Sequence, residues 1–217
     1  MATLNLFSHK KEKEYYNSQE PIWSKNSYAY LFPYFKSVAR DPETEFNGMK
    51  VLEIGAGPAL YSRLIAECYS PSFVVALDLV PVQFSVYRNE IKKAEISLVG
   101  GDCFTLPFPD GSFNIVFGSL ILHRFRELNK VLDELYRVLK KNGSYMGIEP
   151  AVRNPLHVCR HFFSGHSPNE YFLTIGMFRR AFEKSGFVPL VFGISPKYPF
   201  LTNFGMFSCS GIRARKD

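Results

Sequence analysis

The chain has 217 residues, of which 46% are hydrophobic and 21% charged, a length and balance that suit one folded α/β domain with a full core. The net charge of +6 is spread along the chain, which argues against nucleic acid as a partner. The four cysteines lack the spacing of a metal site or a disulfide framework, so we expect no metal and a reduced, cytoplasmic chain. The first residues are polar, unlike a signal peptide, and no apolar run of about twenty residues occurs, so we expect no membrane span.

Residues 1–47 are expected to form an N-terminal helical segment rich in aromatic side chains. This segment either covers the mouth of a site as a lid or packs against the flank of a sheet. In the first arrangement, Tyr16, Trp23 and Tyr28 would shape an apolar substrate pocket and shield it from water.

From residue 48 onward, short apolar runs typical of buried strands alternate with helical patterns. We expect strands at residues 50–54, 73–77, 97–100, 113–118 and 144–149, and helices at residues 59–68, 81–93 and 127–139. This alternation predicts a doubly wound, mostly parallel sheet with helices on both faces.

After Pro150 the pattern changes. An insertion is expected at residues 151–170, followed by a helix at 174–185. Two apolar runs at 187–193 and 205–213 have no helix between them, so they are expected to form an antiparallel pair that closes the sheet of a single domain over 48–217.

The first strand ends in an acid and then turns through two glycines, Glu53-Ile54-Gly55-Ala56-Gly57. Glycines let the backbone turn tightly and let a ligand approach it closely. The amides of the following helix can hold an anionic group. An acid at the end of a buried strand needs a cation or good donors, and an ammonium group on a ligand would satisfy Glu53.

Two more acids follow the next two strands, Asp78 and Asp102. Asp78 is placed to accept hydrogen bonds from ribose hydroxyls, and Asp102 to accept one from the exocyclic amine of adenine. A helix cap or a turn would explain either acid alone. Together with the glycine turn, they predict a site for a nucleoside cofactor at one edge of the sheet.

These motifs, with residues 106–114 and 137–143, resemble the class I S-adenosylmethionine-dependent methyltransferases. The most similar branch is the ubiquinone/menaquinone-biosynthesis type of small-molecule enzymes (methyltransferase type 11). The resemblance implies a Rossmann-like, seven-stranded sheet with an antiparallel last strand. It also implies S-adenosyl-L-methionine as cofactor and S-adenosyl-L-homocysteine as product. The implied cofactor contacts are Glu53, Gly55, Ala56, Gly57, Asp78, Leu79, Asp102, Cys103, Gly118 and Ser119.

The activity that the resemblance implies is in-line transfer of a methyl group to a small, hydrophobic or aromatic molecule. His123 follows the fourth strand and is either the general base or a structural histidine. His157 and His161 lie in the expected insertion, as substrate contacts or as ordinary polar loop residues. The oligomeric state is left open.

Two other functions share parts of this pattern. An NAD-dependent oxidoreductase has a glycine turn and a later acid, but the third glycine of its fingerprint is absent and Glu53 and Asp102 have no role there. A non-catalytic cofactor-binding partner subunit would keep the glycines without an acceptor pocket.

Overall fold

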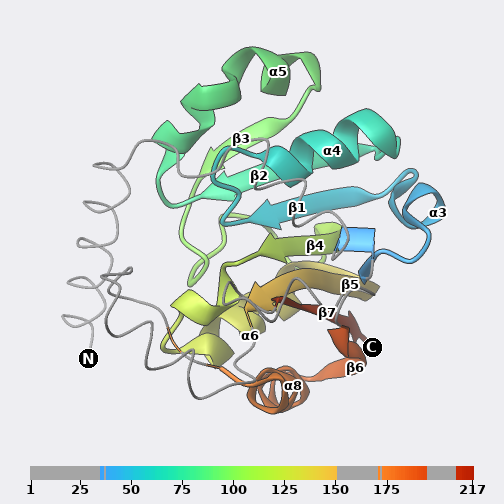
Figure 1. The fold of residues 1–217 in the computed structure, drawn as a ribbon, viewed down its shortest axis with the longest axis vertical. Helices are drawn as coiled ribbons and strands as arrows, with labels where there is room; N and C mark the ends of the chain where they lie inside the picture. The colour runs from blue at the N-terminus through green and yellow to red at the C-terminus, as the bar shows by residue number, and fades with distance from the viewer. Residues whose placement is uncertain (1–34, 37, 151–170, 172, 195–208) are drawn as a thin grey trace, which may run out of the picture.

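The computed structural model describes residues 35–36, 38–150, 171, 173–194 and 209–217 (Figure 1). The strands are β1 (Lys50–Ile54), β2 (Phe73–Asp78), β3 (Ser97–Gly100), β4 (Phe113–Ser119), β5 (Leu139–Pro150), β6 (Phe187–Ile194) and β7 (Cys209–Lys216). The α-helices are α3 (Pro42–Phe46), α4 (Leu60–Cys68), α5 (Arg88–Lys93), α6 (Leu128–Val138) and α8 (Ile175–Lys184). Two 3₁₀ helices, η1 (Pro81–Tyr87) and η2 (Leu122–Arg124), lie between them.

The strands form one seven-stranded sheet in the order β3-β2-β1-β4-β5-β7-β6 (Figure 1). Strands β1 to β5 pair in parallel, whereas β7 runs antiparallel to both β5 and β6. The expected fold is therefore confirmed, including the antiparallel last strand.

Two expected elements differ in detail. The helix expected at residues 81–93 is divided into η1 and α5. In η1 the Ser85 hydroxyl donates to the Val82 carbonyl at 2.7 Å, a local bond that competes with the regular helical ladder. Strand β5 begins at Leu139, because this apolar residue, expected at the end of a helix, is already paired with Phe113 of β4.

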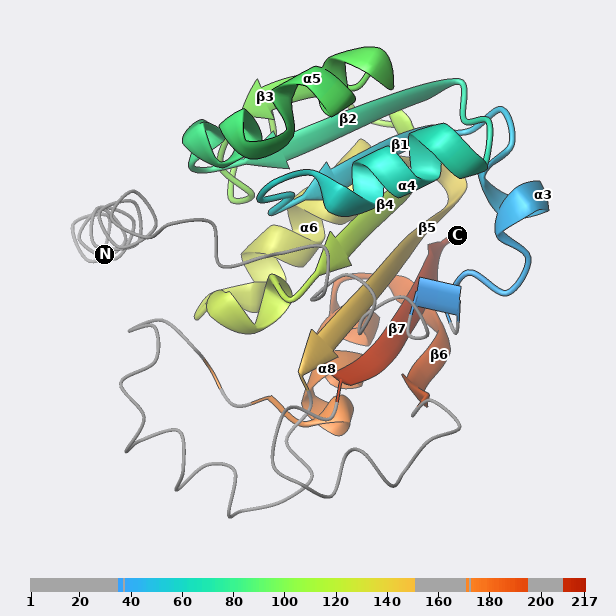
Figure 2. The same cartoon turned by 45° about the horizontal axis from the view of Figure 1, so that its top comes forward.

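Helices cover both faces of the sheet, and α4 and α6 lie on opposite faces (Figure 2). Successive strand residues alternate between two hydrophobic cores, as the period of two requires. In β2, Val74 and Ala76 belong to the core beneath α4 and α5, while Val75 and Leu77 belong to the core beneath α6 and α8. Glu53 lies between Leu52 and Ile54, which belong to the second core, so its side chain faces α4.

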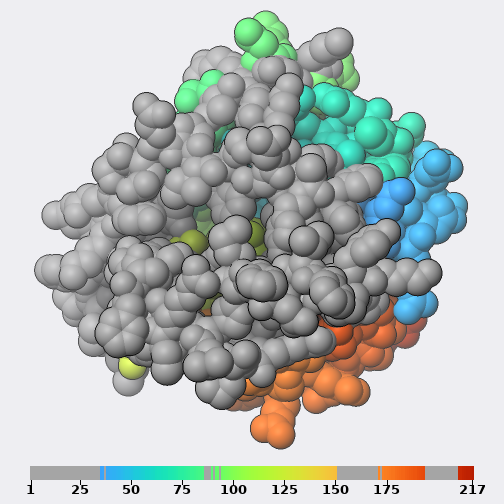
Figure 3. Space-filling view, in the orientation of Figure 1, coloured from blue at the N-terminus to red at the C-terminus, as the bar shows by residue number. Residues whose placement is uncertain are grey.

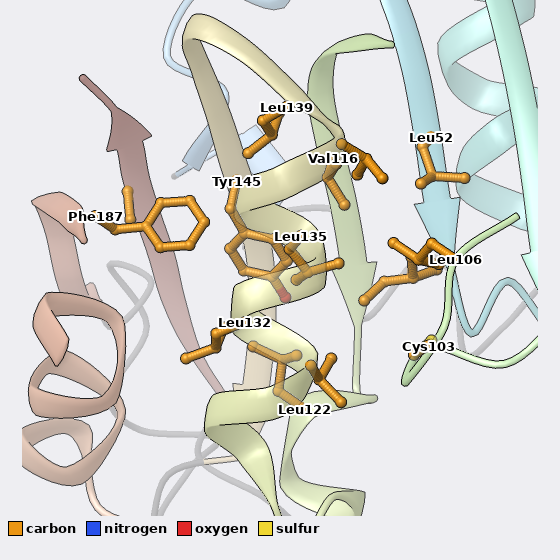
Figure 4. Packing of buried hydrophobic residues seen from close by; sticks show 14 of the residues in the cluster. Leu52, Cys103, Leu106, Val116, Leu122, Leu132, Leu135, Leu139, Tyr145 and Phe187 are labelled. Carbon is orange, nitrogen blue, oxygen red and sulfur yellow. The ribbon is translucent and has the colours of Figure 1, made fainter. Parts of the chain in front are cut away.

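The second core is filled by leucines of α6 and aromatic rings from β5 and α8. The Tyr145 ring lies among Leu132, Leu135 and Leu139 with its hydroxyl directed toward Leu122 (Figure 4). Thr174 caps the start of α8, since its hydroxyl accepts a hydrogen bond from the Met177 amide at 3.2 Å. The outer surface of α8 forms the lower margin of the face drawn in Figure 3, with α3 and α4 along the right margin.

The described end of the N-terminal segment packs on the flank of the sheet. Phe35 is fully buried, and its ring lies 5.8 Å from that of Phe46 and 5.5 Å from that of Phe117. Tyr16, Trp23, Tyr28 and the expected insertion at 151–170, with His157 and His161, lie outside the described residues. In the part of the chain that the structure describes, no helix has the length and apolar character needed to cross a membrane.

Candidate functional site

The carboxyl ends of β1, β2 and β4 meet at one edge of the sheet (Figure 1). Ile54 at the end of β1 pairs with Leu77 of β2 on one side and with Gly118 of β4 on the other. The glycine turn, Asp78 and Ser119 therefore leave the sheet next to one another. This is the edge at which open parallel sheets bind their ligands.

The glycine turn is fixed by its left-handed backbone and by tight packing. Gly55 and Gly57 have φ of 58° and 50°, and Ala59 at the start of α4 has φ of 57°. The Ala56 amide donates to the Leu77 carbonyl at 3.0 Å, which ties the turn to β2. A Cβ atom on Gly55 would lie 2.5 Å from Cγ1 of Ile121, so only glycine fits there.

Glu53 lies beneath this turn and is 2% exposed. Its Oε2 accepts hydrogen bonds from the Ser62 amide at 2.7 Å and the Ser62 hydroxyl at 2.5 Å. Burial outweighs these two bonds and raises the pKa of Glu53 to about 7. The carboxyl group can thus gain or lose its proton near neutral pH, and a cation placed beside it would favour the ionised form.

Asp78 joins the end of β2 to the glycine turn. Its Oδ2 accepts a hydrogen bond from the Gly57 amide and its Oδ1 accepts one from the Val80 amide, both at 2.7 Å. Burial raises the pKa of Asp78 despite these two bonds. Each oxygen has a second acceptor position, so the carboxylate can still bind hydroxyl donors, and Leu79 follows it at the rim.

Asp102 is brought to the same edge by the backbone. The Gly101 amide donates to the Asp78 carbonyl at 3.0 Å, and Asp102 Oδ1 accepts a bond from the Phe104 amide at 2.9 Å. Cys103 is 6% exposed and its side chain lies in the second core near Leu106 (Figure 4). The three expected carboxylates therefore lie in or just after the carboxyl ends of the adjacent strands β1, β2 and β3.

Ser119 supplies a further polar group at the end of β4. Its hydroxyl oxygen is buried and has no hydrogen-bond partner within the described residues. A buried hydroxyl without a partner costs about 1–3 kcal/mol, which a ligand atom can recover. This hydroxyl, the close-packed glycine turn and the remaining acceptor positions of Asp78 all fit a polar nucleoside ligand.

His123 is 6% exposed, and its imidazole is paired with the fully buried Glu149 of β5. The Nδ1 atom lies 2.8 Å from Glu149 Oε2. Sequence reasoning missed Glu149, although it was visible as an acid in the otherwise apolar end of a buried strand. Such an acid needs partners, and β5 places it opposite the chain that leaves β4.

Comparison with known proteins agrees with this geometry. Residues 52–146 match the protein family described as "Methyltransferase domain". This segment includes the glycine turn and the strand ends described above. Residues 52–146 are therefore similar to a methyltransferase domain, in agreement with the resemblance drawn from the motifs.

Individual relatives match the same part of the chain. A demethylmenaquinone methyltransferase of Listeria welshimeri is 34% identical over 49% of this chain and 47% of its own length. A malonyl-[acyl-carrier protein] O-methyltransferase of Legionella pneumophila is 32% identical over 45% of this chain and 34% of its own. The chain thus spans half or less of the length of these curated relatives.

Solved structures extend the similarity of fold to most of the chain. An S-adenosylmethionine-dependent methyltransferase from Mesorhizobium loti has a TM-score of 0.69 and 17% identity, covering 84% of this chain and 98% of its own. A second such enzyme from Aquifex aeolicus has a TM-score of 0.62 and 20% identity, covering 85% and 97%. At this level of identity the comparison concerns the fold.

Proposed function

We propose that this protein transfers a methyl group from S-adenosyl-L-methionine to a small hydrophobic or aromatic molecule, leaving S-adenosyl-L-homocysteine. One observation carries the proposal: Glu53, Asp78 and Asp102 end or follow adjacent strands around a left-handed glycine turn, within the segment that matches the methyltransferase family.

Each carboxylate has its own part of the cofactor in this proposal. Glu53 faces the ammonium group of the methionine moiety, and its pKa of about 7 suits a carboxyl that a bound cation ionises. Asp78 and Leu79 bind the ribose, and Asp102 and Cys103 bind the adenine. Gly55, Ala56, Gly57, Gly118 and Ser119 lie along the methionine end, and the Ser119 hydroxyl, which has no partner among the described residues, supports a ligand there.

The cofactor supplies a methyl group already activated by the positive sulfur. The protein then has to hold a nucleophile in line with the bond between sulfur and the methyl carbon. Alignment of this kind contributes about 7–11 kcal/mol in favourable intramolecular cases. Pairing of β1 with β2 and β4 holds these strand ends in fixed register, which suits such alignment.

The acceptor and the location belong to the same proposal. The relatives named above act on demethylmenaquinone and on malonyl-[acyl-carrier protein], which supports a small or carrier-bound metabolite rather than nucleic acid. A cytoplasmic location is supported by the free, exposed thiol of Cys68. Neither the oxidoreductase nor the silent-subunit alternative gains support from the described residues.

Calorimetry of the full chain with S-adenosylmethionine and, separately, with NAD tests the cofactor. We expect binding of the first only. Asp78→Ala should weaken the affinity for S-adenosylmethionine about ten- to hundredfold, since hydrogen bonds to a charged group are lost. The matched control is Asp110→Ala, whose side chain is 81% exposed and bonded to Arg137, and which should bind as the wild type does. Binding of NAD without S-adenosylmethionine would overturn the proposal.

The same calorimetry tests the contact of Glu53 with the ammonium group, by measuring the protons released when the cofactor binds. At about pH 7, Glu53 carries about half a proton, and an ammonium beside it would expel that half proton. Titrations in buffers of different ionisation enthalpy should show this release in the wild type but not in Glu53→Gln. Release of equal size in both proteins would remove Glu53 from the ammonium role.

The activity itself is tested with methyl-labelled cofactor and a metabolite extract. Label should appear in a small molecule whose mass identifies the acceptor. A protein that binds the cofactor but transfers no label into any extract component would support the silent-subunit alternative instead.

A further inference from the structure

Glu149 collects an unusual number of donors from one short segment. Its Oε1 accepts hydrogen bonds from the amides of Ile121 and Leu122, at 3.1 and 2.8 Å. Its Oε2 accepts one from the His123 amide at 3.3 Å and lies 2.8 Å from His123 Nδ1. All these donors belong to η2 and the residue before it, so one carboxylate organises the whole turn after β4.

This turn packs directly on the proposed cofactor site. The Ile121 side chain lies 2.5 Å from the Cβ position of Gly55 and 3.0 Å from that of Gly118. The Leu120 amide donates to the Ile148 carbonyl at 2.8 Å, which fixes the start of the turn against β5. His123 is therefore two residues from a side chain that touches the glycine turn, on backbone held at several points.

The donor set also favours one tautomer of His123, with Glu149 as a carboxylate. Three backbone amides can only donate, so Glu149 faces them as an acceptor. An acceptor carboxylate at 2.8 Å from Nδ1 requires the hydrogen on Nδ1. The second ring nitrogen, Nε2, then carries the lone pair of the neutral ring and points away from Glu149. A carboxylate that orients a histidine in this way is a recurring arrangement in proton transfer.

We propose that Glu149 is a positioning residue that holds His123 with its hydrogen on Nδ1, so that Nε2 accepts the proton of the methyl acceptor. This deepens the function proposed above and rests on it. The acceptor atom, an O–H or N–H group that arrives protonated, forms a bond to the methyl carbon. The bond between that carbon and sulfur breaks, its electron pair stays on sulfur, and the acceptor's proton moves to Nε2.

Nitrogen NMR of the full chain labelled at histidine tests the tautomer. His123 is assigned by the signals that disappear in His123→Gln. In the neutral ring we expect Nδ1 protonated and Nε2 unprotonated. In Glu149→Gln the amide offers a donor as well as an acceptor, so the ring should populate both tautomers. The wild-type spectrum decides the tautomer even if this variant fails to fold.

A matched variant separates positioning from general loss of a buried carboxylate. Glu134 also accepts a backbone amide, from Leu106 at 2.8 Å, and pairs with Arg137 away from His123. Glu134→Gln should lower stability and leave the His123 signals unchanged. A wild-type ring protonated on Nε2, or His123 signals that stay the same in Glu149→Gln, would overturn the proposal.

Methyl transfer into the acceptor found with labelled cofactor supplies the second readout. His123→Gln should lower turnover about 10²–10⁴-fold and Glu149→Gln about ten- to hundredfold, with cofactor affinity within about twofold of wild type. Wild-type turnover in His123→Gln would overturn this proposal while leaving the methyltransferase function in place. Failure of that function shows separately, as absence of cofactor binding in the calorimetry.

Discussion

At the scale of single residues, Gly55 and Gly57 form a natural comparison. The two have nearly the same φ, 58° and 50°, so alanine at either position meets the left-handed penalty of about 1–2 kcal/mol. Only at Gly55 does the new methyl group collide with Ile121, whereas a Cβ atom on Gly57 would have no atom of the described residues within 4 Å apart from its own chain neighbours. Packing alone distinguishes the two sites.

We therefore expect Gly57→Ala to lower the free energy of unfolding by about 1–2 kcal/mol and Gly55→Ala by about 2–5 kcal/mol, because overpacking adds about 1–3 kcal/mol. Urea denaturation of both variants measures the difference. Ile121→Ala combined with Gly55→Ala should recover part of the added loss. Equal losses at the two glycines would show that the contact with Ile121 is unimportant.

At the scale of elements, Arg137 of α6 holds the chain between β3 and β4, where residues 106–111 form no helix or strand. Its guanidinium donates to the carbonyls of Leu106 and Phe108, and to Asp110. The Arg137 carbonyl accepts a bond from the Gly111 amide at 3.0 Å. A planar group with several fixed donors is needed to reach these acceptors at once.

Arg137→Lys should lower the free energy of unfolding by about 1–3 kcal/mol, since lysine keeps the charge but loses the planar fork. Hydrogen exchange at the Gly111 amide should also accelerate. The control is Arg179→Lys on α8, an exposed pair with Glu183, which should stay within about 0.5 kcal/mol of wild type. Similar effects from the two substitutions would contradict a special role for Arg137.

These contacts explain what sequence could and could not predict. The glycine turn and the strand ends carry local patterns, so the sequence predicts that Glu53, Asp78 and Asp102 lie at one edge of the sheet. The pairing of His123 with Glu149 joins residues 26 positions apart through the register of β4 and β5. No local pattern encodes that register, so the histidine was found and its partner was not.

The boundary between α6 and β5 was predicted wrongly for a related reason. Val138 and Leu139 are both apolar and fully buried, which suits the last turn of a helix as well as the start of a strand. Pairing of Leu139 with Phe113 decides in favour of β5. Ser62, which supports Glu53, was also unpredicted, because a serine inside a helical pattern gives no sign of a buried acceptor beneath it.

At the scale of the whole molecule, the buried acids at the sheet edge set a pH dependence of stability. Burial raises the pKa of Glu53 from 4.5 to about 7, so between these values the folded protein binds more protons than the unfolded chain. The free energy of unfolding therefore falls as pH rises. The contribution of Glu53 to the free energy of unfolding is fully present below about pH 4.5 and is lost above about pH 7.

We expect this contribution to reach about 3 kcal/mol, and Glu53→Gln to lack it. The raised pKa of Asp78 acts in the same direction in both proteins. Urea denaturation of wild type and Glu53→Gln between about pH 5 and about pH 8 gives the difference between their free energies of unfolding as a function of pH. Glu67→Gln, at an exposed acid of α4, should run parallel to wild type, and a flat difference curve for Glu53→Gln would contradict the assignment.

The position of β7 has a consequence for how the protein is made. Strand β7 lies between β5 and β6, and its Lys216 donates to the carbonyl of Tyr136 in the last turn of α6 and to that of Leu139 at the start of β5. A ribosome delivers β5 and β6 before the strand that joins them. Until Cys209–Lys216 has emerged, the nascent polypeptide carries an open strand edge of the kind that chaperones protect from aggregation.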